Sequence, residues 1–194
     1  MRIEPTDDAY VFINEPDANY GDVTYLYTGR YGEQGLWQHA YLRFDLSEIP
    51  SGVDITDARL YLFCFTVWGT QVPIACTEVE DDLWDEWTIT WNNKPEDGPV
   101  LDQELVRVGS REFPISYSWD VTSFVDQEFK GDKIVSLCVR GLEDHPANVN
   151  ESFESKDWPY DNRVRPFLMI TTGALPPVGV SISPGSRGAL PGES

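Results

Sequence analysis

Hydrophobic and polar residues alternate along much of this chain with a period of two, and the 3.6-residue period of amphipathic helices is nearly absent. In residues 41–45, Leu42 and Phe44 fall on one face of an extended backbone, and Tyr41, Arg43 and Asp45 fall on the other. This pattern predicts a strand with one buried face. Residues 59–65 are apolar on both faces, which is typical of a central strand in a sandwich.

Further short strands are predicted along the rest of the chain, at residues 72–79, 88–91, 116–121, 134–139 and 166–172. Turn sequences rich in Pro, Gly, Asn and Asp separate them, at residues 14–17, 49–52, 95–98 and 131–132. Many short strands divided by such turns indicate an all-β fold. We expect a jelly-roll β-sandwich of two antiparallel sheets, with at most one or two short helices.

One short helix is predicted after Asp120 or Thr122 as its N-cap, with Phe124 and Val125 on its buried face and Gly131 at its end. Composition changes near residue 173, where Pro, Gly and Ser become frequent. We therefore expect one jelly-roll domain at residues 1–172, and at 173–194 a linker followed by the start of a truncated repeat. The chain is accordingly expected to be a module that adjoins other domains of the same protein.

The charge of the chain excludes several classes of partner. Its 194 residues include 33 acids and 14 bases, which give a formal net charge of −19. A surface of this sign repels phosphate backbones and anionic lipid head groups, so nucleic-acid binding is not expected. The chain has no run of about 18 apolar residues, so membrane insertion is not expected either.

The three cysteines, Cys64, Cys76 and Cys138, and the two histidines show none of the close spacings of a zinc site or a Cys-His nucleophile. A hairpin turn near Gly69 would bring Cys64 and Cys76 opposite each other. A disulfide between them and two buried free thiols are equally compatible with this placement.

Four segments, in a fixed order along the chain, carry a family resemblance. They are DDAYV at 7–11 with NYG at 19–21, YLRFDLSEIP at 41–50 continuing through ITDARLYL at 55–62, WDEWTITWNNKP at 84–95, and YSWDVT at 117–122 with RPFLMI at 165–170. Together they resemble the DNRLRE domain family, also classed as carbohydrate-binding module family ninety-six and found beside methanogen disaggregatase-related proteins. The resemblance covers roughly residues 5–172.

This resemblance implies a jelly-roll fold, an extracellular or cell-surface location, and binding of uronate-rich polysaccharide in at least some members. It also suggests an archaeal surface protein of the methanogen type. The sequon Asn150-Glu151-Ser152, which we place in a polar loop, is consistent with export.

Acidic residues are densest at residues 78–86, and such acids have two chemical uses, catalysis and calcium binding. A glycosidase needs two carboxylates held across a cleft, one with a raised pKa, and adjacency along the chain provides neither, so no catalytic residue is predicted. Calcium takes six to eight oxygen ligands and often rigidifies loops, so a structural calcium ion is the better use. Its predicted ligands are Asp7, Asp8, Asp17 and Asn19, with Glu80, Asp81 and Asp82 as a second candidate set and a solvated acidic loop as the alternative.

Aromatic rings stack on sugars, and arginines clamp carboxylates with a bidentate fork. The predicted ligand-binding residues are Arg30, Tyr31, Trp37, Tyr41, Arg43, Lys156, Trp158 and Arg163. Trp87, Ile89 and Trp91 share one face of the predicted strand at 88–91, and we expect that face to be buried. Residues 1–93 contain no lysine, which weakens alginate-type binding and favours a neutral or calcium-bridged glycan.

The sequence therefore predicts a non-catalytic carbohydrate-binding module of a larger secreted or surface protein, with polysaccharide as its partner. The alternative is a structural repeat of an archaeal surface sheath or stalk with no glycan site. A binding module requires a groove with exposed aromatic residues, whereas a stalk domain requires its two ends at opposite poles and no groove.

Overall fold

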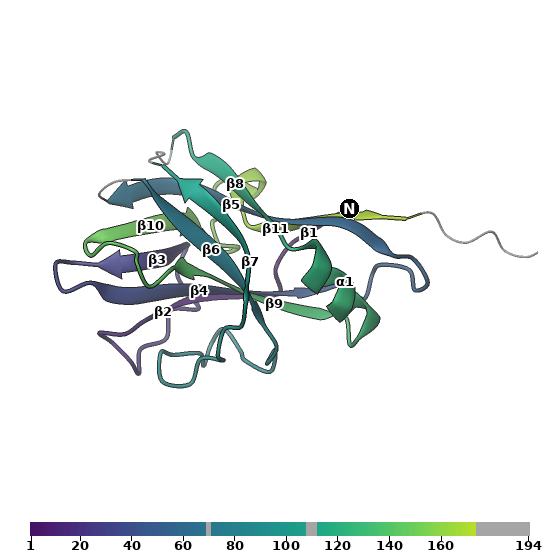
Figure 1. Cartoon of the computed structure of the whole chain (residues 1–194), viewed down its shortest axis with the longest axis horizontal. Coiled ribbons are helices and arrows are strands. Elements are labelled where there is room, and N and C mark those ends of the chain that lie inside the picture. Colours follow the sequence, from purple (N-terminus) through teal and green to yellow (C-terminus); the bar gives the residue numbers. More distant parts are fainter. Residues whose placement is uncertain (69–70, 108–111, 174–194) are drawn as a thin grey trace, which may run out of the picture.

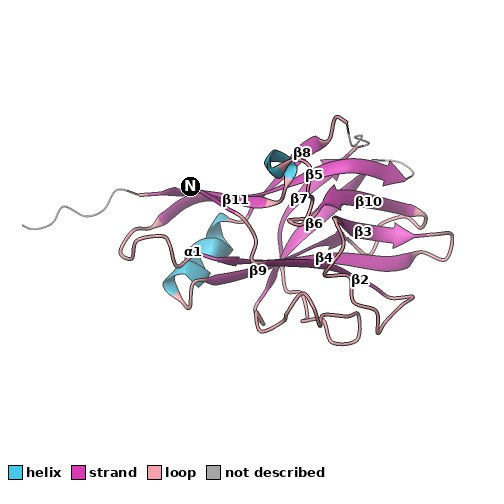
Figure 2. Cartoon of the chain, turned by 180° about the vertical axis from the view of Figure 1, so that it is seen from behind, coloured by secondary structure: helices cyan, strands magenta, loops and turns pink. Residues whose placement is uncertain are grey.

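The computed structural model describes residues 1–68, 71–107 and 112–173, and it is built almost entirely from antiparallel strands (Figures 1 and 2). The strands are β1 (Arg2–Ile3), β2 (Asp7–Phe12), β3 (Tyr25–Tyr31), β4 (Leu36–Asp45), β5 (Ile55–Trp68), β6 (Val72–Val79), β7 (Val100–Val106), β8 (Ile115–Asp120), β9 (Ile134–Gly141), β10 (Val149–Glu154) and β11 (Phe167–Thr172). One α-helix, α1 (Thr122–Lys130), and one 3-10 helix, η1 (Asn162–Val164), complete the described part. Most of the predicted linker, residues 174–194, lies outside these ranges.

The strands form one continuous, strongly curled sheet, a half-barrel, in place of the two separate sheets expected from the sequence (Figure 1). The sheet is continuous because its long strands change partners along their length. Strand β5 pairs with β11 at its beginning, where Arg59 lies opposite Met169, and with β10 at its end, where Val67 lies opposite Glu151. Strand β4 joins β2, β9 and β3 in the same way. Strands this long twist, so the sheet coils around one core instead of splitting into two layers.

The main hydrophobic core fills the concave side of the curled sheet. Trp119, Phe153, Leu42 and Leu62 are completely buried there. The Trp119 indole donates a hydrogen bond across the core to the Ile74 carbonyl at 2.9 Å, which ties β8 to β6. Burial of a large aromatic side chain with its polar atom satisfied stabilises the fold without leaving an unpaired donor.

A second, smaller core lies on the opposite face of β2, β4, β6 and β9. Val11 and Tyr41 contribute to it, alternating with the residues that face the main core. Its cover is the long connection between β6 and β7, residues 80–99, whose Trp84 and Ile89 pack onto the strands. We call this connection the 80–99 loop. It runs below β4 and β9 in Figure 1.

The strand predicted at residues 88–91 is wrong, because this segment forms turns within the 80–99 loop. The Asp85 carbonyl accepts hydrogen bonds from the amides of Thr88 and Ile89, and Asn93 Oδ1 accepts from Thr90, which closes the backbone on itself. Side chains of this kind compete with strand pairing. The predicted common face is consequently split, since Ile89 is 1% exposed and Trp87 is 61% exposed.

The predicted helix is confirmed as α1, with Phe124 and Val125 on its buried face and Gly131 as its C-cap. The residue at the N-cap position is Val121, but the Asp120 carboxylate accepts hydrogen bonds from the Thr122 amide at 3.0 Å and hydroxyl at 2.7 Å. Within the described ranges, neither helix has the length and apolar character needed to cross a membrane. The three cysteines are buried and reduced, so Cys64 and Cys76 form no disulfide.

Gly21 lies where the backbone of the β2–β3 loop contacts the 80–99 loop. A Cβ atom there would lie 2.0 Å from the Glu86 carbonyl oxygen, which is held in place by the Asn19 amide at 2.7 Å. Gly21→Ala is therefore expected to lower the free energy of unfolding by about 2 kcal/mol, as measured by urea denaturation. At Gly131 a Cβ would meet only ordinary contacts at 3.4 Å, so Gly131→Ala serves as the control. Equal stability of the two variants would contradict this prediction.

Candidate functional site

A cleft of about 470 Å³ opens where β2, β3 and β4 meet the loop between β2 and β3. Its lining residues come from strands β2, β3, β4 and β10 and from the loop between β2 and β3. Its lining residues are Tyr10, Phe12, Asn14, Glu15, Tyr20, Tyr27, Tyr31, Gln38 and Asn150. The size and the mixture of aromatic and polar residues are typical of small-ligand sites.

Aromatic contacts hold the rings of the cleft in place. Tyr10 stacks on Tyr20 with ring centroids 4.3 Å apart and meets the edge of Tyr27 at 5.1 Å. Tyr31 contacts Phe12 edge-on at 5.8 Å and remains 54% exposed. Rings fixed by neighbouring rings lose little conformational freedom on binding, so the cleft is preorganised for a flat apolar surface such as the face of a sugar.

Apart from Glu15, the polar groups of the cleft are neutral donors and acceptors. Gln38 is 3% exposed, and within the described ranges its Oε1 atom has no hydrogen-bond partner. Burial raises the pKa of Tyr10 well above its usual range and the pKa of Tyr20 to about 12, so both hydroxyls stay protonated. A buried acceptor without a partner favours a ligand that donates a hydrogen bond, as sugar hydroxyls do.

The electrostatics of the cleft disfavour anionic ligands. Glu15, which accepts a hydrogen bond from the Tyr20 hydroxyl, is the one charged side chain among the described lining residues. A carboxylate at this position repels a second carboxylate brought in by a uronic acid. The geometry therefore fits an uncharged sugar better than a uronate.

Of the residues predicted from sequence to bind ligand, Tyr31 lines the cleft. Arg30 and Trp37 lie together, with the guanidinium 4.9 Å from the indole centroid, but neither lines the cleft. Arg30 donates instead to the carbonyls of Gly35 at 3.0 Å and His145 at 2.9 Å, so it braces the surrounding turns.

Tyr41 and Arg43 hold the 80–99 loop against the sheet. Tyr41 is completely buried, and its hydroxyl donates to the Pro95 carbonyl at 3.0 Å, so it presents no surface to a sugar. Arg43 pairs with Asp7 at 2.6 Å and donates to backbone carbonyls of the loop. The sequence correctly predicted that Tyr41 and Arg43 share one face of β4, opposite Leu42 and Phe44. It did not predict that the 80–99 loop covers this face.

Lys156, Trp158 and Arg163 lie between β10 and β11, and none of them lines the cleft. The Lys156 ammonium pairs with Glu86 at 3.0 Å, and Arg163 pairs with Asp161 at 2.8 Å. The Trp158 ring meets Tyr160 edge-on at 4.9 Å. Lys156 and Arg163 are therefore each paired with a nearby acid of this chain and need no bound ligand to balance their charge.

The four predicted calcium ligands are dispersed among separate contacts. Asp7 pairs with Arg43, and the Asp17 carboxylate accepts a hydrogen bond from Asn92 at 2.8 Å. Asn19 donates to the carbonyls of Glu86 and Ile89, and Asp8 accepts from Ser155 and Lys156. Calcium binding stays a prediction, and it would require these residues to exchange their present partners.

Asp8 makes folding stability depend on pH. Burial raises its pKa from 3.8 to about 7, against the lowering effect of the Lys156 and Ser155 contacts. Between these values the folded chain keeps a proton that the unfolded chain has released, so stability falls as pH rises from about 4 to about 7. Relative to Asp8→Asn, the wild-type protein should lose up to about 4 kcal/mol across this window. Urea denaturation of both proteins tests this, and parallel pH profiles would contradict it.

Most of the cleft was missed from the sequence. Tyr10 and Tyr20 lie in the first family segment, but neither was distinguished from a core residue. The alternation of Tyr25, Tyr27 and Tyr31 is a usable signal for β3, which was not predicted. Asn150, assigned to a polar loop, lies instead in β10 and is 5% exposed, so the sequon is not in an accessible loop.

Fixed tyrosine rings beside neutral hydrogen-bonding side chains in one cleft suit the recognition of a sugar. The chain belongs to carbohydrate-binding module family 96, whose model matches residues 1–172. It is also 34% identical over 161 residues to a gellan lyase from a Bacillus species. That match covers 81% of this chain but 6% of the relative's length, so the chain corresponds to a small part of that protein. The relative is bacterial and lends no support to the predicted archaeal source.

Proposed function

We propose that this domain binds polysaccharide through the tyrosine-lined cleft and has no catalytic role of its own. The observation that carries the proposal is the combination of fixed tyrosine rings with the buried, unpartnered Gln38 Oε1 in one cleft of the described structure. Rings of this kind cover the apolar face of a sugar, while Gln38 and Asn150 meet its hydroxyls.

The preferred ligand is a polysaccharide that presents uncharged sugar units to the cleft. Glu15 and the net charge of −19 both oppose a chain of uronates. An acidic polysaccharide with neutral units between its uronates can still offer a neutral unit to this site. A bound calcium ion that bridges an acidic glycan is the competing mode, and it requires calcium for binding.

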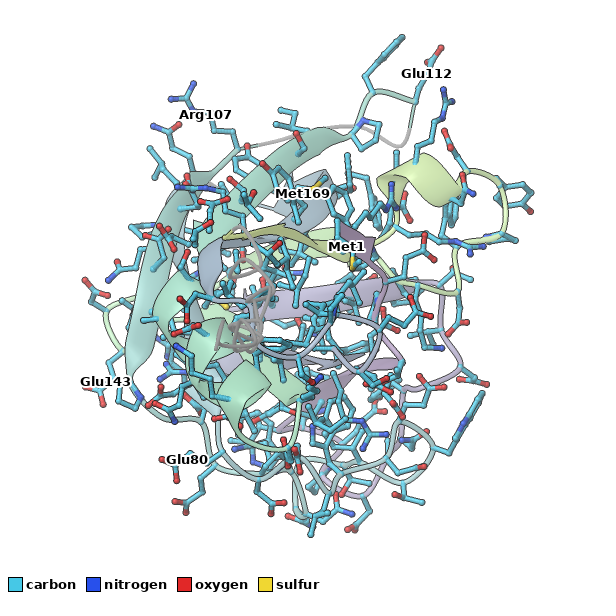
Figure 3. The ribbon with its side chains drawn as sticks, turned by 90° about the vertical axis from the view of Figure 1, so that its right-hand side faces the viewer. Met1, Glu80, Arg107, Glu112, Glu143 and Met169 are labelled. Atoms are coloured by element: carbon cyan, nitrogen blue, oxygen red, sulfur yellow. The ribbon has the colours of Figure 1, made fainter. Side chains whose placement is uncertain are left out.

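Two features favour a binding module over a structural repeat. The cleft itself is one. The other is the position of the two domain ends, which lie side by side because β1 pairs with β11, with Arg2 opposite Met169 (Figure 3). A stalk built from repeats in series requires ends at opposite poles. Hydrolysis is disfavoured because Glu15 is the single carboxylate among the described residues of the cleft, and glycosidases use two.

In this proposal the domain tethers a larger extracellular or cell-surface protein to its polysaccharide, alongside other domains of the same chain. Affinity gel electrophoresis with gellan, alginate and dextran, each with calcium and with a chelator, tests the proposal. We expect retention by gellan or dextran that exceeds retention by alginate and does not need calcium. Absence of retention on all three would refute polysaccharide binding, and measurable depolymerisation would refute the non-catalytic role.

A further inference from the structure

Three side chains that are far apart in the sequence converge under the 80–99 loop. His39 comes from β4, Cys138 from the neighbouring strand β9, and Asp97 from the loop itself. One potential ligand atom from each lies within 4.8 Å of the other two. All three lie away from the tyrosine-lined cleft, whose lining includes none of them.

His39 is the residue of this cluster whose buried side chain has an unsatisfied nitrogen atom. It is 9% exposed, and its Nδ1 atom has no hydrogen-bond partner in the described part of the chain. A buried imidazole nitrogen with no hydrogen-bond partner favours a ligand that can bind to it, and imidazole is a common metal ligand.

Asp97 is held in position by a partner outside the cluster. Arg140 Nε donates to Asp97 Oδ2 at 2.5 Å. Outer-shell contacts of this kind orient metal-binding carboxylates and leave the second oxygen available. The guanidinium also balances the charge of Asp97 when no cation is bound.

A small cavity of about 210 Å³ borders the cluster at His39. Its walls are Trp37, His39, Trp91, Arg140, Gly141 and Glu143. His39 meets the edge of Trp91 at a centroid distance of 5.0 Å, so its ring forms part of the cavity wall. The cavity therefore reaches the imidazole of His39, whereas Asp97 and Cys138 are not among its lining residues.

We propose that His39, Asp97 and Cys138 bind a divalent transition-metal ion such as Zn²⁺. Imidazole nitrogen, thiolate sulfur and carboxylate oxygen are together the donor set that zinc prefers, whereas calcium and magnesium select oxygen ligands. Binding converts the Cys138 thiol to a thiolate and releases its proton to solvent. The thiolate and the carboxylate then neutralise the dication.

The bound metal would fasten the 80–99 loop to the sheet. Two ligands belong to adjacent strands and the third to the loop, so the ion cross-links elements that otherwise meet through side-chain packing and hydrogen bonds. This role is independent of the proposed glycan binding, since the cleft contains none of the ligands.

A second group of acids, Asp8, Glu86 and Asp157, also brings three carboxylates within 4.8 Å. There the Lys156 ammonium lies 3.0 Å from Glu86 and 2.9 Å from Asp157, so a cation already occupies the acidic group. Arg140 likewise pairs with Asp97 in the first cluster, so the two groups differ in their donor atoms instead. The second group offers carboxylate oxygens alone, whereas His39 and Cys138 add nitrogen and sulfur, which favours the first cluster for a transition metal.

Titration of the untagged, reduced protein with Co²⁺ tests the assignment. We expect one equivalent to bind, with a thiolate-to-cobalt charge-transfer band and the visible absorption of a tetrahedral ion. Zn²⁺ should displace the Co²⁺ and raise the unfolding temperature by several degrees. Absence of the charge-transfer band in the wild-type protein would overturn the proposal, whatever the variants do.

Cys138→Ser should abolish the charge-transfer band and the Zn²⁺-dependent rise in unfolding temperature. Cys76→Ser is the matched control, because Cys76 is equally buried but belongs to the main core. His39→Gln provides a second test if the serine variant fails to fold by circular dichroism. A band that survives in Cys138→Ser or in folded His39→Gln would also overturn the assignment.

Discussion

Arg43→Ala is expected to lower the free energy of unfolding by about 3 kcal/mol or more. The Arg43 guanidinium pairs with Asp7 at 2.6 Å, donates to the carbonyls of Asp82 and Trp84, and lies over the Trp84 ring. Removal of the guanidinium leaves the Asp7 carboxylate, which is 11% exposed, without its counter-ion. It also leaves two loop carbonyls without a donor, so the loss combines an uncompensated charge with unsatisfied acceptors.

Chemical denaturation measures this loss, and Arg59→Ala is its control. Arg59 also pairs with aspartates, but at 3.5 Å and with a side chain that is 38% exposed, so its removal should cost less than about 1 kcal/mol. If the two variants were equally stable, Arg43 would not be the main attachment of the 80–99 loop.

Tyr31→Ala is expected to weaken polysaccharide binding about tenfold, since one stacking ring contributes on the order of 1.4 kcal/mol. Tyr31 is the most suitable ring of the cleft for this test, because it is 54% exposed and its loss leaves no large cavity in the core. Isothermal titration calorimetry with the glycan retained most strongly by the wild-type domain measures the change.

Tyr160→Ala is the matched control for Tyr31→Ala. Tyr160 is 82% exposed and lies outside the cleft, so its removal should leave the affinity unchanged. Equal affinity losses in the two variants would place the glycan site elsewhere, whereas no loss in either would remove Tyr31 from the site.

The strand pattern was predictable where burial on one face is strong. Leu42 and Phe44 identified β4 because both enter the main core, and Phe124 and Val125 identified α1 for the same reason. The continuity of the sheet was not predictable, because it depends on β5 changing its partner from β11 to β10 partway along its length. Such an exchange of partner strands follows from strand twist. It does not change the local alternation of hydrophobic and polar residues.

Site residues were harder to predict than strands, because exposure depends on what covers a face. Tyr41 points outward from β4 as its phase predicts, yet the 80–99 loop buries it. The cleft, in turn, combines residues as distant as Tyr10 and Asn150, so only Tyr31 was identified among its lining residues. The cluster of His39, Asp97 and Cys138 has no recognisable spacing for the same reason, since strand register and loop docking create it.

The pairing of β1 with β11 also determines how the domain responds to mechanical force. The Ile170 amide donates to the Met1 carbonyl at 2.8 Å, so the first and last of the described strands meet at one end of the molecule. The turn between β3 and β4, beside the cleft, lies at the other end (Figure 1). Tension between the flanking segments of a longer chain would load the β1–β11 hydrogen bonds one after another and peel off the two-residue β1 first. The force would reach the cleft only after this edge had separated, so β1 and β11 would come apart before the proposed binding site was disturbed.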